Sequence, residues 1–427
     1  MTRLGVGICG LGTVGAGTFN LIRTNAAEIS RKTGTSVVVA QVGCRRDNPA
    51  CDLSGVNVTR DIFEVTRNPD VDVIVELIGG TDTALELVKE AIAHGKHVVT
   101  ANKALIAVHG EEIFRLAGAA GVSVRFEAAI AGGIPIVKSI REGLAANRIE
   151  FVAGIINGTS NFILTEMESA GNRSFEQVLQ EAQELGYAEA DPTFDIEGID
   201  AAHKLTILSS IAFGVPLHFE AMYTEGISNI TPADIRYAGE LGYRIKHLGI
   251  TRRREDGIEL RVHPTLVAKE TLLAQVDGVM NAVLVGSDAA GKTMYYGAGA
   301  GAGPTASSVV GDIIDIMRDS SAVANLGFVP EAIQPMPVIG IESVRCCYYL
   351  RLRAHDKPGV LARISTILSQ HNISIESLIQ KDVRQGAAPI VIITDDVTES
   401  ELDRALAELG SLEEVDDAIT RIRVESF

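Results

Sequence analysis

The amino-acid sequence predicts an α/β protein with three units: a doubly wound parallel sheet, an α+β unit and a small βαββαβ unit. Three observations support this division. Apolar, β-rich runs alternate with helical stretches in the first third, and longer helices with later strands follow in the middle. A weakly charged, proline-containing segment then precedes an independent pattern. The length of 427 residues also suits two or three domains.

Composition and charge exclude several classes of protein. With 46% apolar residues the chain can fill a large core, which excludes intrinsic disorder. The net charge, 38 − 55 = −17, repels phosphate backbones and anionic lipid, so we expect no nucleic-acid or membrane partner. Five cysteines without zinc or CxxC spacing suit buried thiols in a cytoplasmic protein.

The first unit is expected over residues 1–132. Its strands are continuous apolar runs separated by helices, which is typical of a parallel sheet covered on both faces. The expected strands are 4–9, 36–42, 71–78, 97–100 and 122–126, and the expected helices are 13–31, 82–94 and 102–120.

The second unit is expected over residues 133–296, with mixed strand order. Its expected elements are helices 135–144, 162–170, 175–185 and 201–213 and a strand at 259–266. The glycine- and alanine-rich stretch 297–308 is either a flexible linker or a tight packed loop. Because Pro304 suits the first turn of the helix that follows, we favour the packed loop, with 297–325 returning to complete the first unit.

The third unit is expected over residues 346–427, after a linker at 326–345. The order strand, helix, strand, strand, helix, strand is the ferredoxin-like arrangement. The expected strands are 348–353, 373–380, 389–394 and 418–424, and the expected helices are 359–370 and 399–409.

Residues 10–15 read GxGxxG, directly after an expected strand and at the start of a helix. This context is typical of a dinucleotide-binding turn. Gly10 permits the tight turn, Gly12 lets a pyrophosphate approach the backbone, and Gly15 lets the helix pack on the strand. The free N–H groups of the helix start favour phosphate. The expected cofactor contacts are Gly10, Leu11, Gly12, Thr13, Val14 and Gly15.

The end of the second expected strand bears on the choice between NAD and NADP. No acid that could bind ribose hydroxyls occurs between residues 36 and 46, whereas Arg45 and Arg46 could hold a 2′-phosphate. This pattern favours NADP. NAD remains open, because Asp47 is a possible ribose ligand and the arginines could be an ordinary solvated pair.

The segment 189–200 is rich in acids and leads into a helix that begins near Asp200. Asp200 and Lys204 are spaced i, i+4 and so share a face of that helix, with apolar neighbours. A lysine in such a partly dry place loses its proton more readily, which suits a proton donor held by a carboxylate. The alternative is an ordinary ion pair of small stabilising value. We expect His203 to be structural.

A second lysine, Lys103, follows directly after an expected strand. Ligands of open α/β sheets bind at the carboxyl ends of the strands. A cation is disfavoured at a helix start, so this lysine is either an ordinary surface residue or a functional one.

Together these motifs resemble the homoserine dehydrogenase family with a C-terminal ACT domain, over nearly the whole chain. The most specific part is the run 182–204, where the matching residues are Ala182, Gly186, Tyr187, Asp191, Pro192, Asp195, Gly198, Asp200 and Lys204. Further similar motifs are residues 10–15, 100–103, 157–161, 301–307 and 356–360.

The resemblance implies NAD(P)-dependent interconversion of L-aspartate 4-semialdehyde and L-homoserine, in the biosynthesis of threonine, methionine and isoleucine. It implies that Lys204 transfers the proton, that Asp200 positions Lys204, and that Lys103 reaches both substrate and cofactor. Gly301 is implied to lie beside the nucleotide. The implied substrate contacts are Gly158, Thr159, Glu189, Asp195, Asp200 and Lys204.

The resemblance also implies a monovalent cation such as sodium, held near Glu127 by oxygens of Ile130, Gly132 and Ile134. An ordinary buried turn is the alternative.

The ACT domain implies an amino-acid effector site at Asp356, Gly359 and Asn372, with threonine as the natural candidate. A pure dimerisation module is the alternative, and a homodimer or homotetramer fits either.

Two other functions compete with this interpretation. One is a different dehydrogenase of a small amino acid or its semialdehyde, and the other is a non-catalytic sensor of nucleotide and amino acid. Both leave the acids and lysine of segment 189–204 unexplained.

Overall fold

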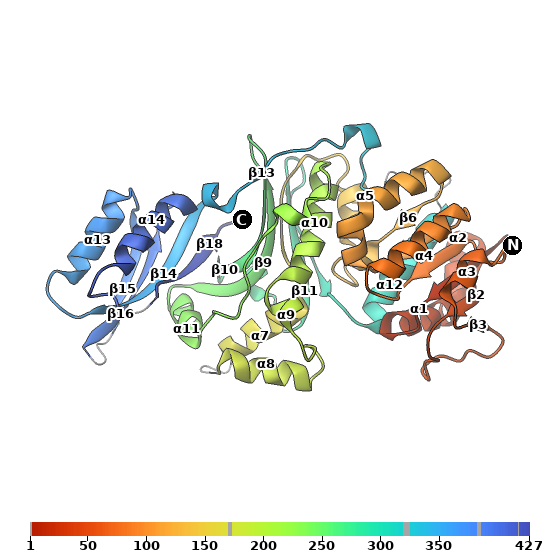
Figure 1. The fold of residues 1–427 in the computed structure, drawn as a ribbon, viewed down its shortest axis with the longest axis horizontal. Helices are drawn as coiled ribbons and strands as arrows, with labels where there is room; N and C mark the ends of the chain where they lie inside the picture. Colours follow the sequence, from red (N-terminus) through yellow and green to blue (C-terminus); the bar gives the residue numbers. More distant parts are fainter. Residues whose placement is uncertain (1, 170–172, 319–324, 382–385, 417) are drawn as a thin grey trace.

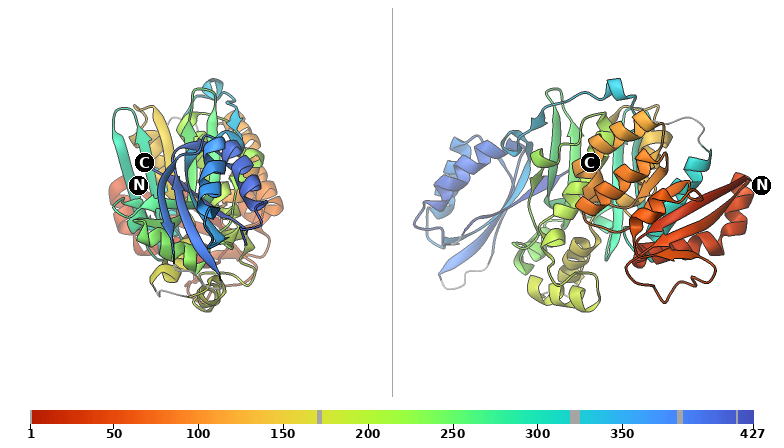
Figure 2. Two further views of the ribbon diagram at one scale, coloured as in Figure 1. Left: turned by 90° about the vertical axis from the view of Figure 1, so that its left-hand side faces the viewer. Right: turned by 45° about the vertical axis from the view of Figure 1, so that its right-hand side comes forward.

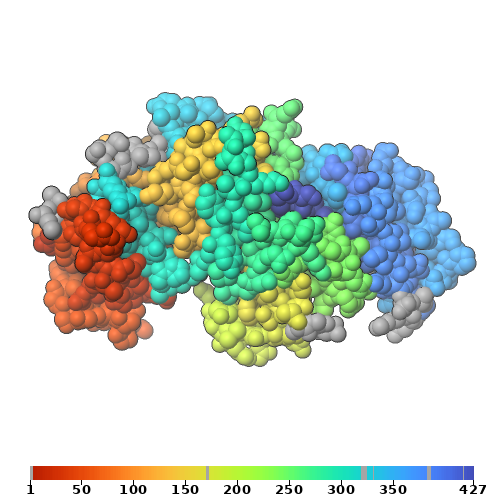
Figure 3. All heavy atoms as spheres, turned by 180° about the vertical axis from the view of Figure 1, so that it is seen from behind, coloured from red at the N-terminus to blue at the C-terminus, as the bar shows by residue number. Residues whose placement is uncertain are grey.

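The fold is described from a computed structural model that covers residues 2–169, 173–318, 325–381, 386–416 and 418–427. The molecule is elongated, with the N-terminal unit at one end, a mixed sheet in the middle and the C-terminal unit at the other end (Figures 1 and 3). None of the described helices is long and apolar enough to cross a membrane. All five cysteines are free, and four of them are buried.

The N-terminal unit contains a six-stranded parallel sheet in the order β3-β2-β1-β4-β5-β6. This is the doubly wound order of dinucleotide-binding folds, and it confirms the predicted class. The expected helix 13–31 is interrupted at Asn25. The strands are β1 (Thr2–Cys9), β2 (Thr35–Gly43), β3 (Asn57–Thr59), β4 (Val73–Glu76), β5 (His97–Thr100) and β6 (Val124–Arg125). The helices are α1 (Thr13–Thr24), α2 (Ala26–Thr33), α3 (Ile62–Arg67), α4 (Asp82–Ala93) and α5 (Lys103–Ala120).

A later helix, α12 (Ala302–Arg318), returns to this unit and packs on α1. Its buried residues Val309 and Ile313 share a core with Val6 and Phe19. The expected return over 297–325 includes residues 319–324, which lie outside the described residues.

The middle unit is built on five antiparallel strands in the order β12-β11-β7-β9-β10. These are β7 (Ile149–Ile155), β9 (Tyr243–Arg253), β10 (Ile258–Ala268), β11 (Met280–Ser287) and β12 (Gly291–Ala298). The main helices are α7 (Gly158–Ser169), α8 (Phe175–Glu184), α9 (Thr193–Ile196), α10 (Ile199–Phe213) and α11 (Pro232–Glu240). The expected helix 135–144 is instead α6 (Ile136–Lys138) followed by a π-helical turn, Ser139–Gly143.

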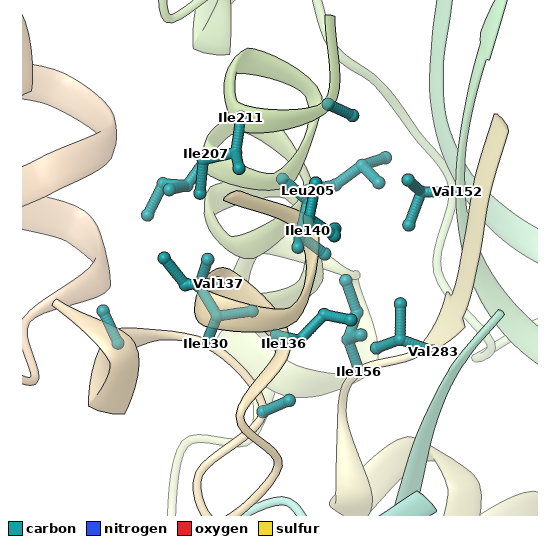
Figure 4. Close-up of a cluster of buried hydrophobic side chains, with 14 of the residues drawn as sticks. Ile130, Ile136, Val137, Ile140, Val152, Ile156, Leu205, Ile207, Ile211 and Val283 are labelled. Atoms are coloured by element: carbon teal, nitrogen blue, oxygen red, sulfur yellow. The ribbon is translucent and has the colours of Figure 1, made fainter. Parts of the chain in front are cut away.

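Helix α10 is almost wholly buried, which holds its two charged residues in place. Figure 4 shows its apolar side chains within a cluster drawn from α6, the π-helical turn, β7 and β11. The labelled members are Ile130, Ile136, Val137, Ile140, Val152, Ile156, Leu205, Ile207, Ile211 and Val283.

The C-terminal unit has the predicted βαββαβ order, with sheet order β18-β14-β16-β15 and both helices on one face (Figure 2). Its strands are β14 (Arg345–His355), β15 (Ile375–Gln380), β16 (Ala387–Thr394) and β18 (Thr420–Glu425), and its helices are α13 (Val360–Gln370) and α14 (Glu399–Gly410).

The C-terminal unit is joined to the middle unit by a strand pairing that the expected linker at 326–345 does not suggest. Strand β18 pairs in parallel with β10, so that both sheets form one continuous sheet. Strand β9 pairs along one edge of β10. The other edge of β10 pairs with three strands along its length: β13 (Val338–Ile339), β8 (Tyr223–Thr224) and β18. Strand periodicity predicts a strand but does not reveal its partner. The unit boundaries themselves stay predictions.

Candidate active site

The GxGxxG turn has the geometry that its glycines predict. Gly10 has a φ of +99°, and a Cβ there would lie 2.5 Å from the carbonyl oxygen of Leu77. A Cβ on Gly15 would lie 2.0 Å from the oxygen of Gly10, so this close helix–strand packing needs glycine. Gly12 faces open space and caps α1 without a side-chain bond in the described chain. The first amides of α1, beginning at Thr13, are therefore available to an anion.

The glycine- and alanine-rich stretch is packed, as expected: a Cβ on Gly132 would lie 2.3 Å from the carbonyl oxygen of Gly299, and the start of α12 lies against α1. A Cβ on Gly17 would be 2.4 Å from the oxygen of Ala302. Gly301, with a φ of +127°, makes the turn into α12 and is exposed. Gly301 therefore lies close to α1, the helix that follows the glycine-rich turn.

Arg45 and Arg46 follow β2 and are exposed, and neither makes a hydrogen bond or ion pair within the described chain. Asp47 is held by Arg60, with Nη2 2.9 Å from Oδ1. Arg60 also donates to the carbonyl oxygen of Cys44 at 3.1 Å. The sequence does not predict Arg60, because it lies beyond β3 and reaches the end of β2 only through the parallel pairing of these strands.

Helix α10 carries Asp200 and Lys204 on one face, as their spacing predicts. The Nζ of Lys204 donates to Asp200 Oδ2 at 2.6 Å and to the carbonyl oxygen of Ile156 at 2.7 Å. The lysine side chain is only 12% exposed. An ammonium group has three N–H donors, so one remains for a ligand.

Lys103 approaches the same carboxylate from the N-terminal unit. It is the first residue of α5, and its Nζ lies 3.1 Å from Asp200 Oδ1. The same Nζ lies 5.7 Å from the ring centre of Phe194. Asp200 is therefore held between two lysines from different units, and the cluster sits where those units meet.

Asn157 belongs to this cluster, although the sequence does not single out its side chain. Its Nδ2 donates to Asp195 Oδ1 and to Asp200 Oδ2, both at 2.8 Å. The only signal is its place in the 157–161 motif. Gly158 and Thr159 begin α7 beside it, and the Thr159 hydroxyl donates to the carbonyl oxygen of Tyr187 at 2.7 Å.

Glu189 stands apart from the other expected substrate residues. It is exposed, and no described contact joins its carboxylate to Lys103 or Lys204. Its backbone oxygen accepts a hydrogen bond from Gln183 at 3.1 Å. The structure thus gathers Asp195, Asp200 and both lysines but not Glu189.

The charges of the cluster shift its pKa values in opposite directions. Burial lowers the pKa of Lys204, and the charge of Lys103 adds to this, while Asp200 opposes it. Burial would raise the pKa of Asp200, but the two lysines outweigh it and hold that pKa well below its usual value. Burial raises the pKa of Asp195. The arrangement thus favours an ionised Asp200 beside a lysine that releases its proton more readily.

His203 lies in an aromatic stack beside the cluster. Its ring centre is 4.2 Å from that of Phe219 and 5.5 Å from that of Phe194. Burial lowers the pKa of His203, and Lys103 acts in the same direction, so the ring stays neutral.

The expected cation residues form a buried bend. The Glu127 carboxylate accepts from the amides of Val137 and Lys138, both at 2.8 Å, and burial raises the Glu127 pKa to about 7. The Gly132 carbonyl accepts from the Ser308 hydroxyl at 2.6 Å.

Two further carbonyls of the bend accept backbone hydrogen bonds, that of Ile134 from Ile136 and that of Glu127 from Ile130. In the described part of the chain no three His, Cys, Asp or Glu side chains group to hold a metal. Any cation here depends on carbonyl oxygens.

The expected effector residues do not form one site within one chain. Asp356 and Gly359 precede α13, whereas Asn372 follows it. Eleven helical residues at 1.5 Å each separate the two ends by roughly 16 Å. The two ends are therefore too far apart for one small ligand to contact both within a single chain.

Family models match three successive segments of the chain: the homoserine dehydrogenase NAD-binding domain at residues 10–127, the homoserine dehydrogenase domain at 135–314 and the ACT domain at 348–414. Homoserine dehydrogenase of Pseudomonas aeruginosa is 59% identical over 434 residues, with both chains covered completely. The chain belongs to the homoserine dehydrogenase family. The family's enzymes are NAD(P)-dependent oxidoreductases, and this chain is one of them.

Solved structures of the family agree with the fold. A homoserine dehydrogenase from Thiobacillus denitrificans is 55% identical with a TM-score of 0.94, covering 100% of this chain and 99% of that one. A hyperthermophilic archaeal homoserine dehydrogenase in complex with NADPH is 27% identical with a TM-score of 0.63, covering 77% of this chain and 99% of that one. The six-stranded unit is thus the family's NAD(P)-binding domain, and the C-terminal unit is an ACT domain.

Proposed function

We propose that Lys204 is the proton-transferring group in this chain's interconversion of L-homoserine and L-aspartate 4-semialdehyde. The observation that carries the proposal is the Lys204–Asp200–Lys103 cluster between the cofactor-binding and middle units, in which one N–H of Lys204 has no acceptor among the described residues. The bound nicotinamide exchanges a hydride with the carbon that is the alcohol carbon of homoserine or the carbonyl carbon of the semialdehyde.

Lys204 and Asp200 divide the acid–base work. When the aldehyde is reduced, the Lys204 ammonium gives a proton to the developing alkoxide oxygen. When homoserine is oxidised, neutral Lys204 takes the hydroxyl proton, which a lowered pKa favours. Asp200 and the Ile156 carbonyl orient the Lys204 nitrogen. Lys103, 3.1 Å from Asp200, adds a second positive charge that stabilises the alkoxide.

We propose that the substrate's polar end binds at Gly158, Thr159, Asp195 and Glu189. Asp195 is in the cluster, which supports its contact with the ammonium group of the substrate. Glu189 is exposed, and its carboxylate is suited to the substrate ammonium as well.

For the cofactor we propose a preference for NADP. Arg45 and Arg46 are exposed at the end of β2 and have no partner among the described residues, while Arg60 occupies Asp47, the alternative ribose ligand. Gly10 to Gly15, Lys103 and Gly301 complete the proposed contacts.

We also propose a sodium ion bound by carbonyl oxygens of Glu127, Ile130, Gly132 and Ile134. A carbonyl oxygen has two lone pairs, so those that already accept a hydrogen bond keep one for the ion. The carboxyl groups of Glu127 and Asp312 are buried beside the bend, so a cation there offsets the cost of ionising them. Its role is structural.

The decisive experiment is an assay of homoserine oxidation with NADP and with NAD, followed by cofactor absorbance. We expect turnover with both and a higher kcat/KM with NADP. Turnover of other small hydroxy amino acids with none of homoserine contradicts the proposal.

For regulation, we propose that threonine binds at Asp356, Gly359 and Asn372 between ACT domains of two chains in a homodimer or homotetramer. The separation of Gly359 and Asn372 along α13 supports a shared site. Asn372→Ala is expected to abolish inhibition by threonine and to leave the uninhibited rate unchanged. Equal inhibition of variant and wild type contradicts this site.

A further inference from the structure

Asn157 lies immediately before α7 and is only 5% exposed. Its Oδ1 accepts from the backbone amide of Ser160 at 2.8 Å, the bond of an N-terminal helix cap. Because the oxygen is used on α7, the NH₂ group must face the opposite way, toward α9 and α10.

The two N–H groups of this amide meet two different carboxylates. One donates to Asp195 of α9 and the other to Asp200 of α10. The preceding residue, Ile156, accepts from Lys204. Two consecutive residues of the chain thus contact both acids and the lysine.

We propose that Asn157 is a positioning residue, which bridges Asp195 and Asp200 and thereby keeps Asp200 against Lys204 and Asp195 turned toward the substrate. The inference rests on the proposed function and deepens it, since it names the residue that holds the acids of that site at a fixed separation.

A neutral amide suits this position better than a charged group. Asp195 faces Asp200 and Lys204 of α10 and Lys103 of α5. An acid at position 157 would add a third negative charge, and a basic residue would compete with the lysines for Asp200. The amide offers two donors and carries no charge, so it does not weaken the ion pairs of Asp200 with the two lysines.

The test compares Asn157→Ser with Asn161→Ala. Serine is also a good N-cap, so this variant keeps the start of α7 but loses the two N–H donors. Asn161 lies in the first turn of α7 and is fully buried, and its hydrogen bonds within the described chain go to the carbonyl oxygens of Val276, Gly278 and Met280. It controls for loss of a buried amide away from the acids.

The first readout is thermal unfolding between pH 4 and pH 8, without substrate. The bonds from Asn157 lower the pKa of both acids in the folded state, so their loss raises these values. The Tm deficit of Asn157→Ser is expected to grow as pH rises through the range in which Asp195 ionises, because the folded-state pKa of Asp195 is raised and the lost bond stabilises its ionised form. Asp200, whose pKa is held well below its usual value, is ionised throughout this range and contributes a constant loss. The deficit of Asn161→Ala is expected to be independent of pH.

The second readout is the pH profile of kcat/KM for homoserine oxidation. We expect Asn157→Ser to lower kcat/KM about a hundredfold, since a displacement near 1 Å can cost that much. The limb that rises with pH is expected to move to lower pH, because an Asp200 that is no longer held against Lys204 raises the Lys204 pKa less. Asn161→Ala keeps the wild-type profile.

Identical behaviour of the two variants in both readouts would overturn the bridging role. Failure of the wild type to oxidise homoserine overturns the proposed function, while the unfolding comparison still decides on the bridge.

Discussion

Two buried charge clusters lie on the middle unit, and they use different cations. In the active site, Asp200 is paired with Lys204 and Lys103. At the junction of β10 with β18, Arg261 lies between Glu259 at 2.8 Å and Glu425 at 2.5 Å. Arg423, of β18, donates to Glu399, to Glu225 and to the Tyr223 hydroxyl.

The difference follows from the chemistry of the two side chains. Arginine keeps its proton at any ordinary pH, and its planar group can saturate several acceptors at once. The arginines at the junction of β10 with β18 therefore stay charged, and their ion pairs hold the two parts of the sheet together. Lysine has a pKa that burial can shift, and Lys204 keeps one N–H free. The two clusters show that burial and pairing alone do not mark a catalytic site.

The largest expected effect is at the proton-transferring lysine. Lys204→Ala is expected to lower kcat by about 10²–10⁴, the usual contribution of a general acid, while cofactor binding persists. Lys204→Arg keeps the charge but cannot release the proton, so it is expected to be similarly slow. Steady-state assays and cofactor titration measure both. Turnover near the wild-type rate in either variant would contradict the role of Lys204.

Breaking the arginine cluster is expected to affect stability instead. Arg261→Met leaves Glu259 and Glu425 buried without this partner, which costs about 3–5 kcal/mol of unfolding free energy. Denaturant unfolding measures the loss. The control is Arg345→Ala, whose pair with Asp396 is exposed and contributes about 1 kcal/mol at most. Equal losses in the two variants would show that the junction cluster contributes no more than a surface pair.

The lysine cluster is also expected to respond to pH. Homoserine oxidation needs neutral Lys204, so its rate is expected to rise with pH through a pKa below the ordinary lysine value. Asp200→Asn removes the charge that raises the Lys204 pKa, and is therefore expected to move this limb to lower pH while kcat falls. The profile of kcat against pH checks this, with Asp396→Asn as the control. A limb that moves upward would exclude Lys204 as the titrating group.

The smallest expected effect is at exposed arginines, which belong to neither cluster. Arg46→Ala is expected to raise KM for NADP about tenfold, the loss of one charge-assisted hydrogen bond, and to leave KM for NAD unchanged. Arg45→Ala serves as the parallel variant. Equal changes for both cofactors in both variants would show that neither arginine contacts the 2′-phosphate.

The sequence predicts features that depend on nearby residues. The GxGxxG turn, the i, i+4 pairing of Asp200 with Lys204 and the βαββαβ order are all local patterns, and the structure contains each of them. Lys103 was also predictable, because the carboxyl ends of parallel strands meet at one edge.

Contacts between distant segments could not be predicted in the same way. Asn157 reaches Asp195 and Asp200 only because α7 starts beside α9 and α10. The hydrophobic patterns of β10 and β18 predict two strands, but they do not indicate that these strands pair with each other.

The pairing of β18 with β10 has a consequence for the order in which the chain folds during synthesis. Leu266 and Val267, fully buried in β10, pair with a strand that is made long after them. Earlier units fold first on the ribosome, and until β18 arrives this edge is open to strands of other chains. The last strand of the ACT domain therefore protects the catalytic sheet from aggregation, independently of any effector.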